Sequence, residues 1–217
     1  MKFAIKLAAV AALLSSLGAA QAQSNSPEKF YGGLEVGRAN VTDQTGELTR
    51  GLVSQVGGTA SATQSSSVND YRIFGGYKLN ENVNFELGYV QTSSFGVNFS
   101  GRSSGSVAYA GSAGLKFAGF DYSVLLRPDV ATGMNGLFFR LGGHSLKSTT
   151  DVNFTVSGSN YSSTTKESGT GTMYGIGYDL NIAKNAALRV SVNRLNKIAG
   201  QSDANATVYS VGVLTRF

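Results

Sequence analysis

The sequence of 217 residues contains no cysteine and a single histidine, which removes two large classes of site. Without cysteine there is no disulfide framework, so the fold depends on hydrogen bonding and burial. No metal-ligand spacing is present either, and we expect neither a metal nor another cofactor. The two prolines, Pro27 and Pro128, lie outside the alternating segments described below, as expected because proline cannot donate a backbone hydrogen bond to a sheet.

The chain also lacks an apolar run long enough to cross a membrane as a helix, which takes about 20 residues. Its one sizeable run, residues 7–20, follows the cationic Lys2 and Lys6 and precedes the small-residue pattern of Ala20, Gln21 and Ala22. This arrangement predicts a cleaved signal peptide over residues 1–22 and a mature domain over residues 23–217. If the exported protein sits in a membrane, it must therefore do so as strands.

Charged residues are sparse, at 14% of the chain. The formal charge of +5 falls to +3 when Lys2 and Lys6 leave with the leader, and the remaining charges are scattered singly. Nucleic-acid binding usually needs a basic stripe on one face, so we exclude it as the function of this exported chain. The 28 glycines and many Ser and Thr residues are instead typical of a sheet-rich protein with polar loops.

Segments of alternating apolar and polar residues recur along the chain, and each is close to the roughly 9 to 11 residues that a tilted strand needs to cross a bilayer. In the fourth segment Leu115 and Phe117 fall in the opposite parity to Phe120, and a bulge near Ala118 and Gly119 would reconcile the two halves. The eight predicted strands cover residues 30–40, 70–79, 83–89, 115–126, 137–144, 174–180, 188–193 and 209–217.

The connections between these segments alternate between long and short. Outer-membrane barrels have short periplasmic turns and long external loops. We therefore predict an all-β fold, an eight-stranded antiparallel up-and-down transmembrane barrel with both ends on the periplasmic side. The polar external loops are expected at residues 41–67, 98–112, 147–170 and 197–205, and the turns at residues 80–82, at Pro128 with Asp129, and at 183–185.

The two faces of each predicted strand differ in character. One face is uniformly apolar, whereas the other mixes small polar residues with single charges. A large share of the ten Tyr and twelve Phe residues would have to fill the narrow interior if the apolar face pointed inward, as in a soluble barrel. We therefore place the charged face inside, where it forms a predicted lumenal charge network of Glu35, Arg72, Glu86, Asp121, Arg140, Asp179 and Arg189.

Two interpretations of this network remain open. Buried charges cost several kcal/mol each unless they are paired, so the acids and arginines should pair with one another across the lumen. The first interpretation is a packing core that fills the barrel, with strand glycines making room for the long side chains. The second is a salt-bridge gate of Glu86, Asp121, Arg140 and Arg189 whose rearrangement opens a narrow pore.

Several strand sequences resemble those of OmpA-like and OmpX-like eight-stranded outer-membrane barrels, namely residues 85–89, 139–143, 174–178 and 208–213. The resemblance spans the mature chain and implies a lumenal cluster at Glu86, Arg140 and Arg189. Gly177 stands where that family tends to place a second Glu, a role that Asp179 can take. The chain ends at the barrel, so we expect no periplasmic peptidoglycan-binding domain.

The last strand carries a further feature of such barrels. Its alternating apolar positions end with an aromatic residue, which resembles the signal read by the barrel-assembly machinery. The predicted membrane-insertion signal comprises Tyr209, Val211, Val213 and Phe217. The resemblance also implies contact with outer-membrane lipid and lipopolysaccharide, location in the outer membrane of a Gram-negative bacterium, and a monomeric state.

Catalysis finds little support in the chain. His144 and Ser145 are the only hint of hydrolysis, but adjacent residues of a strand point to opposite faces, whereas a catalytic triad requires its side chains to meet. We therefore predict a protein without enzymatic activity. A lipid A-modifying enzyme is kept as the third hypothesis.

The leading functional hypothesis is a structural role in envelope integrity together with surface interactions, and the alternative is a narrow porin-like channel. The external loops offer Arg50, Tyr161, Lys166 and Glu167 as contacts for an extracellular ligand or lipopolysaccharide. Solvated loops of similar composition also occur simply as caps on a barrel.

Overall fold

The computed structural model describes residues 29–217 except residue 44 and residues 129–134. The predicted signal peptide, Pro27 and Asp129 lie outside the described residues. Within them, no helix has both the length and the apolar character needed to cross a membrane.

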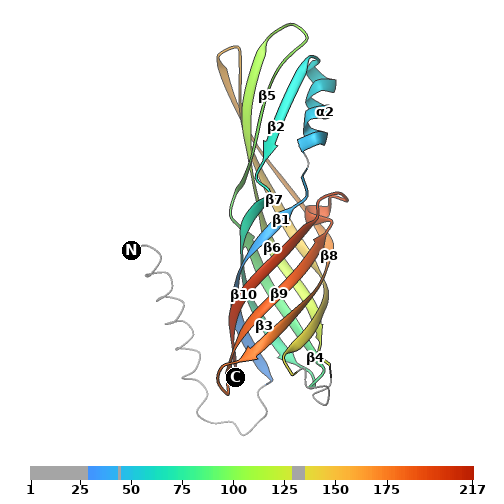
Figure 1. The fold of residues 1–217 in the computed structure, drawn as a ribbon, viewed down its shortest axis with the longest axis vertical. Coiled ribbons are helices and arrows are strands. Elements are labelled where there is room, and N and C mark those ends of the chain that lie inside the picture. Colours follow the sequence, from blue (N-terminus) through green and yellow to red (C-terminus); the bar gives the residue numbers. More distant parts are fainter. Residues whose placement is uncertain (1–28, 44, 129–134) are drawn as a thin grey trace, which may run out of the picture.

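A closed barrel of eight antiparallel strands forms the body of the molecule (Figure 1). The order around the barrel is β6-β4-β3-β1-β10-β9-β8-β7, and β7 pairs with β6 to close the ring. The strands are β1 (Phe30–Val41), β3 (Ser67–Lys78), β4 (Val83–Thr92), β6 (Ala108–Leu126), β7 (Leu137–Val156), β8 (Ser159–Asn181), β9 (Ala186–Asn196) and β10 (Ala206–Arg216).

The first and last strands close the barrel through to the end of the chain. β1 and β10 pair from Tyr31↔Arg216 to Val41↔Ala206. Beyond this ladder, Phe30 N–H donates to Phe217 O at 3.2 Å, and Phe217 N–H donates to Phe30 O at 2.9 Å. The C-terminal residue is therefore held by two backbone hydrogen bonds, so the barrel has no frayed edge at this seam.

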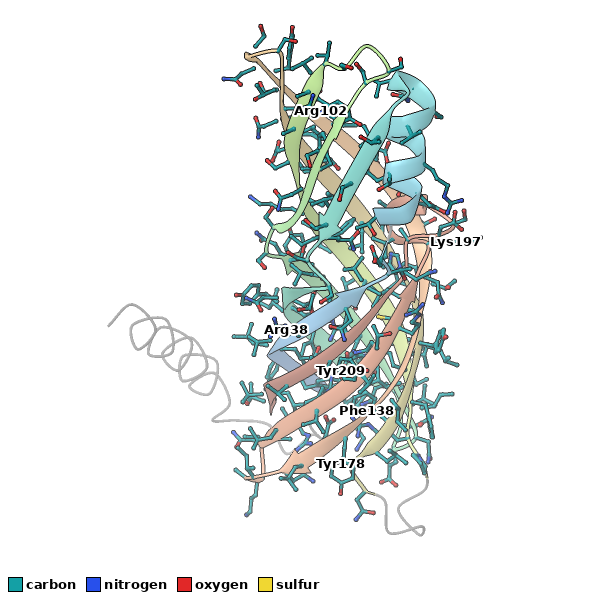
Figure 2. The ribbon with its side chains drawn as sticks, turned by 45° about the horizontal axis from the view of Figure 1, so that its top comes forward. Arg38, Arg102, Phe138, Tyr178, Lys197 and Tyr209 are labelled. Atoms are coloured by element: carbon teal, nitrogen blue, oxygen red, sulfur yellow. The ribbon has the colours of Figure 1, made fainter. Side chains whose placement is uncertain are left out.

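The outer surface of the barrel carries the apolar set that the alternation predicted. Figure 2 shows Tyr178 near the lower end of the barrel and Tyr209 higher on it, and the two side chains are 41% and 52% exposed. Such a belt of exposed apolar side chains suits a surrounding bilayer and would be a liability in water. Its further members include Val36, Tyr71, Ile73, Phe85, Leu87, Phe120, Tyr122, Phe139, Leu141, Tyr174, Ile176, Leu180, Val190 and Val211.

The predicted external loop at residues 147–170 is wrong, because this segment forms a long hairpin. β7 and β8 pair one-to-one as far as Val156↔Ser159, and the tip residues Ser157 and Gly158 have φ of 48° and 83°. Two consecutive positive φ values make a tight hairpin turn whose twist matches that of the strands. The Ser and Thr content suggested a loop, although Val152, Phe154 and Val156 keep the alternation of a strand.

Two other predicted loops are also folded. Residues 41–67 contain helix α2 (Thr45–Val56) and strand β2 (Thr59–Gln64), and residues 98–112 lie largely in β5 (Phe95–Arg102) and the start of β6. β2 pairs with β5, and β5 pairs with β6, so the sheet continues above the barrel. This upper part of the molecule comprises α2, β2, β5 and the segments 108–117, 147–156 and 159–170. We call it the extracellular extension.

The remaining predicted loop, 197–205, contains the short helix η2 (Ile198–Gly200). The short turns at residues 80–82 and 183–185 are confirmed, since β3 ends at Lys78 before β4 begins at Val83, and β8 ends at Asn181 before β9 begins at Ala186. The connection through Pro128 lies partly outside the described residues.

The predicted bulge near Ala118 and Gly119 is also wrong. The pairing of β6 runs one-to-one through both residues, with Ala118↔Lys147 and Gly119↔Leu146 on one side and Gln91↔Ala118 on the other. Leu115 and Phe117 therefore share the inner face with Asp121, and both pack against a buried apolar cluster. The change in pattern reflects a change in the lumen, which is charged at mid-height and apolar above.

Candidate functional site

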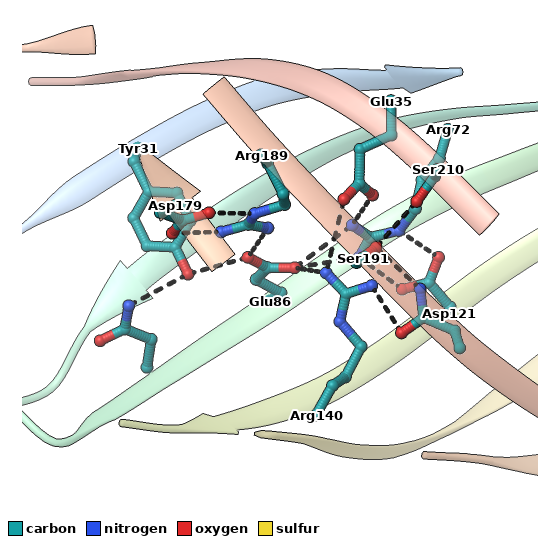
Figure 3. Close-up of polar contacts among 12 residues, drawn as sticks. Tyr31, Glu35, Arg72, Glu86, Asp121, Arg140, Asp179, Arg189, Ser191 and Ser210 are labelled. Carbon is teal, nitrogen blue, oxygen red and sulfur yellow. Dashed lines mark hydrogen bonds and ion pairs between the residues drawn. The ribbon is translucent and has the colours of Figure 1, made fainter. Parts of the chain in front are cut away.

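The structure brings the seven charged side chains of the predicted network together inside the barrel (Figure 3). Each comes from the inner face of a strand and extends across the lumen. Arg72 on β3 lies among three carboxylates. Its Nη1 is 2.8 Å from Glu35 Oε2, and its Nε and Nη2 donate to the two oxygens of Asp121 at 2.8 and 2.7 Å. The two-point contact fixes the plane of the guanidinium group.

Glu86 on β4 is the centre of the network, because its two oxygens contact three arginines. Oε2 lies 2.9 Å from Arg140 Nη2 and 3.2 Å from Arg72 Nη1. Oε1 accepts from Arg189 Nη1 at 2.6 Å and from the hydroxyl of Tyr31 at 3.1 Å. Glu86 thus joins strands that are not neighbours in the sheet.

Asp179 on β8 completes the periplasmic side of the network. Arg189 Nε and Nη2 donate to its two oxygens at 2.7 and 3.0 Å. Asp179 Oδ2 also pairs with Nη2 of Arg127, a residue that the sequence analysis missed because it lies just beyond the end of β6. Its parity matches that of Asp121 and Ser123, which is the signal that could have found it.

Arg127 balances the charges of the ion-paired group. With it, the described residues supply four acids and four arginines to these pairs. We call this set the charge layer: Glu35, Arg72, Glu86, Asp121, Arg127, Arg140, Asp179 and Arg189.

Aromatic rings support the guanidinium groups of the charge layer. The Cζ of Arg189 lies 4.8 Å from the centroid of Phe74 and 4.7 Å from that of Phe138, and Arg72 lies 4.7 Å from Phe74. These contacts are within the range of cation–π attraction, which strengthens when the groups are removed from water. Tyr31 was also missed as a partner, although it shares the parity of Glu35 on β1.

Glycines on the inner face leave the space that these side chains occupy, as predicted. A Cβ at Gly88 would lie 2.6 Å from Asp121 Oδ2 and 2.7 Å from Arg72 Nε. Gly177 makes room for Phe138, since a Cβ there would overlap the ring. Asp179, two residues further along β8, supplies the carboxylate.

The charge layer closes the lumen. The side chains of Glu86 and Arg189 are both 0% exposed, and those of Arg140 and Glu35 are 1% exposed. Each charge of this layer is paired, which offsets the high cost of removing it from water.

Apolar layers lie on both sides of the charge layer. Towards the periplasm Tyr31, Phe74, Ala187 and Leu214 form a buried cluster. Towards the outside a larger cluster fills the lumen, with Phe95, Val97, Leu146, Met173, Leu195, Ile198 and Val208 among its members. The lumen is therefore layered, and a polar solute entering from outside meets an apolar plug before it meets any charge.

His144 and Ser145 do not form a common site, in line with their opposite positions on the strand. His144 is fully buried in the lumen, where Nε2 lies 3.1 Å from Asn196 O, and Ser145 is on the exposed outer face. Among the described residues, no group of three or more His, Asp or Glu side chains is placed to hold a metal ion.

The predicted loop contacts are spread over the extracellular extension. Arg50 is exposed on α2, and Lys166 is exposed on β8. Tyr161 stacks on Phe154 with ring centroids 5.1 Å apart, and Glu167 accepts from Gln201 Nε2 at 2.6 Å. These side chains do not converge on one site.

In the last strand the side chains follow the predicted alternation. Tyr209 and Val211 are 52% and 56% exposed on the outer face, whereas Leu214 is buried in the lumen. Val213 and Phe217 are half-buried. Tyr209, Val211 and Val213 of β10 thus lie on the lipid-facing side, beside the seam with β1.

A closed antiparallel barrel with an apolar outer belt and a charged, filled lumen defines an outer-membrane β-barrel protein. The chain belongs to the outer membrane protein beta-barrel domain family, whose model matches residues 9–217. The protein is therefore located in the cell outer membrane.

Solved structures of outer-membrane barrels are similar to this chain at low sequence identity. Ail of Yersinia pestis is 15% identical, with 88% of this chain and 100% of that chain covered and a TM-score of 0.45. OprG of Pseudomonas aeruginosa is 13% identical over 87% and 94%, with a TM-score of 0.47. Neisserial surface protein A is 17% identical over 87% and 97%, with a TM-score of 0.37. No curated protein matches the chain.

Proposed function

We propose that this protein is a closed, non-conducting barrel that contributes to the integrity of the outer membrane and presents a folded surface to the outside. The observation that carries the proposal is the charge layer, whose central side chains, Glu86 and Arg189, are fully buried across the lumen. A barrel filled by its own paired side chains leaves no room for a solute. It therefore does not conduct, and it serves to anchor the extracellular part in the membrane.

The extracellular extension supports the second half of the proposal. β7 and β8 continue as a paired hairpin well beyond the barrel, and β5 and β2 widen the same sheet. Ordered strands hold side chains in fixed positions, which a partner can recognise at a lower entropic cost than mobile loops. The protein thus works as a rigid platform without enzymatic activity.

A channel is the second candidate function, and the position of Glu86 favours it. One carboxylate shared by Arg72, Arg140 and Arg189 has alternative pairings available, and a switch of partner would move two guanidinium groups. In this mechanism Glu86, Asp121, Arg140 and Arg189 act as a gate.

Single-channel recording on the reconstituted full-length barrel separates the two functions. We expect no conductance steps from the unaltered protein. Glu81→Ala, which removes an exposed acid at the β3–β4 turn, serves as the control and should also be silent. Reproducible small conductance in the unaltered protein that changes in Glu86→Ala would establish the channel and overturn the closed barrel.

Lipid A modification is the third function to test. His144 is sealed in the lumen and Ser145 faces outward, so the two side chains have no shared approach to a substrate. We expect unaltered lipid A mass spectra after overexpression of the protein. New lipid A species that have lost an acyl chain and depend on His144 would contradict a platform without catalysis.

The terminal strand supports a proposal about assembly. We infer that the barrel-assembly machinery reads Tyr209, Val211, Val213 and Phe217, which form the apolar face of the strand that closes the barrel. Phe217→Ala should slow assembly and leave more unfolded chain in the periplasm. Phe30→Ala, across the seam, is the matched aromatic control, and equal assembly rates for all three proteins would contradict this role.

A further inference from the structure

A cavity of about 620 Å³ lies inside the extracellular extension, between the sheet and helix α2. Its walls are the inner faces of β5, β6 and β7, which alternate towards it with the same parity as the lumen below. We call this cavity the apolar chamber. Val97, Phe99, Leu115, Val152 and Phe154 line its walls.

No Asp, Glu, Lys or Arg side chain is among the described residues that line the chamber. The polar groups there are neutral: Gln55, Gln64, Ser103, Thr150 and the hydroxyl of Tyr109, which donates to Thr59 O at 3.1 Å. A site of this composition attracts apolar compounds and offers no countercharge to an ion.

Helix α2 covers the chamber with an incompletely packed face. Leu48, Leu52 and Val56 recur every four residues, which places them on one side of the helix, and all three line the cavity. None of the described residues of α2 is buried, and Val56 is 41% exposed. An apolar helical face normally gains its stability by burial, so this one has packing left to gain.

The chamber has a closed floor. Phe95, Val97 and Leu115 belong both to its lining and to the apolar cluster that fills the lumen beneath. Below that cluster the charge layer closes the barrel. The chamber is therefore open to a molecule from the outer side and backed by packed side chains on the barrel side.

We propose that the apolar chamber binds one neutral, predominantly apolar small molecule taken from the external medium. Its volume falls within the roughly 300–1,000 Å³ of typical ligand sites. The ligand would complete the packing of α2 against the sheet. This inference names a class of ligand for the proposed surface role. It depends on that role at one point, namely that the extension faces the outside.

The test is a fluorescence titration of the full-length barrel in lipid nanodiscs with N-phenyl-1-naphthylamine, a neutral apolar fluorophore. Ala113 lies on the inner face of β6 between Val97 and Val152, so Ala113→Trp fills the chamber. Its neighbour Ser112 is exposed on the opposite face, and Ser112→Trp is the matched control.

We expect a saturable signal of one fluorophore per barrel, above that of empty nanodiscs, for the unaltered protein and Ser112→Trp. In Ala113→Trp the affinity should fall at least tenfold. A signal that does not saturate, or equal affinity in all three proteins, would overturn the proposal. So would native mass spectrometry that finds a lipid held by the unaltered protein and lost in Ala113→Trp, because the occupant would then be an acyl chain.

A second variant covers the case in which Ala113→Trp does not fold, as judged by its migration on a gel with and without boiling. Val152→Thr keeps the shape of the chamber and exchanges one methyl group for a hydroxyl. The affinity should fall about fourfold or more, since the free energy gained by burying one methyl-sized group corresponds to a change of about that size. Unchanged affinity in Val152→Thr would contradict the chamber as the binding site.

The binding test and the conductance test fail independently. A barrel that conducts but binds the fluorophore saturably loses the proposed closed function and keeps the chamber as a binding site. A barrel that is silent and does not bind the fluorophore saturably keeps the proposed closed function and loses the chamber as a binding site.

Discussion

At the scale of single residues, the structure depends on how Glu86 shares its two oxygens among Arg72, Arg140 and Arg189. Burying a charge is tolerated only with partners, and removing one member of a buried network leaves the others uncompensated. Among the described residues of the charge layer, Glu86 and Arg72 each have three ion-pair partners, and Glu86 also accepts a hydrogen bond from Tyr31, so the loss of Glu86 should be strongly damaging.

We predict that Glu86→Gln lowers the free energy of unfolding by about 3–5 kcal/mol, because three arginines then lose a shared countercharge. Urea titration of the refolded barrel in phospholipid vesicles measures the change. Glu81→Gln is the control, and this exposed position should change stability by less than about 0.5 kcal/mol. Equal stability of the two variants would mean that the charge layer does not hold the barrel together.

At the scale of secondary-structure elements, the alternation along each strand predicted both the strands and their faces. In β4, Phe85 and Leu87 flank Glu86, and a local period of two is enough to separate the lipid-facing from the lumenal side chains. The turn at residues 80–82 followed from the same local signals. These features are predictable because they depend on neighbours in sequence.

Other features depend on surroundings that the local pattern does not report. An apolar residue that faces lipid looks the same in sequence as one that faces an apolar chamber, which is why Leu115 and Phe117 suggested a bulge. Val152 and Phe154 alternate like a strand, but the Ser and Thr residues around them suggested a loop. The partners of Glu86 come from strands that are not adjacent, so strand alternation predicted a shared lumen without the individual contacts.

The upper hairpin gives an element-scale prediction for hydrogen exchange. β7 pairs with both β6 and β8 up to Val156, whereas residues 160–166 of β8 pair only with β7. Amides of β7 should therefore exchange slowly throughout, and those of residues 160–166 should alternate between slow and fast. Nuclear magnetic resonance of the labelled barrel measures both. Uniformly fast exchange over residues 147–170 would show a loop in place of the hairpin.

At the scale of the whole molecule, the layers of the lumen define two different ends. The periplasmic end has short turns and a polar mouth that includes Lys78, Glu81 and Arg127. The other end rises into the extracellular extension with its apolar chamber (Figure 1). The charge layer lies between these two ends.

This orientation can be tested because the chain has no cysteine of its own. We expect Ser162→Cys, on the upper part of β8, to react in intact cells with a polyethylene-glycol maleimide too large to cross the outer membrane. Glu81→Cys, at the β3–β4 turn, should react only after the cells are lysed. The reverse result would place the extension in the periplasm.

The central claim is that a paired charge layer seals the lumen, and the arginine side chains report on it directly. We propose to measure solvent exchange of the guanidinium N–H groups by nuclear magnetic resonance at neutral pH, with the exposed Arg50 and Arg102 as internal references. Arg72, Arg140 and Arg189 should show resolved signals that exchange with water far more slowly than the references do. Exchange of all five at the same fast rate would mean that water fills the lumen, and this would contradict the sealed barrel.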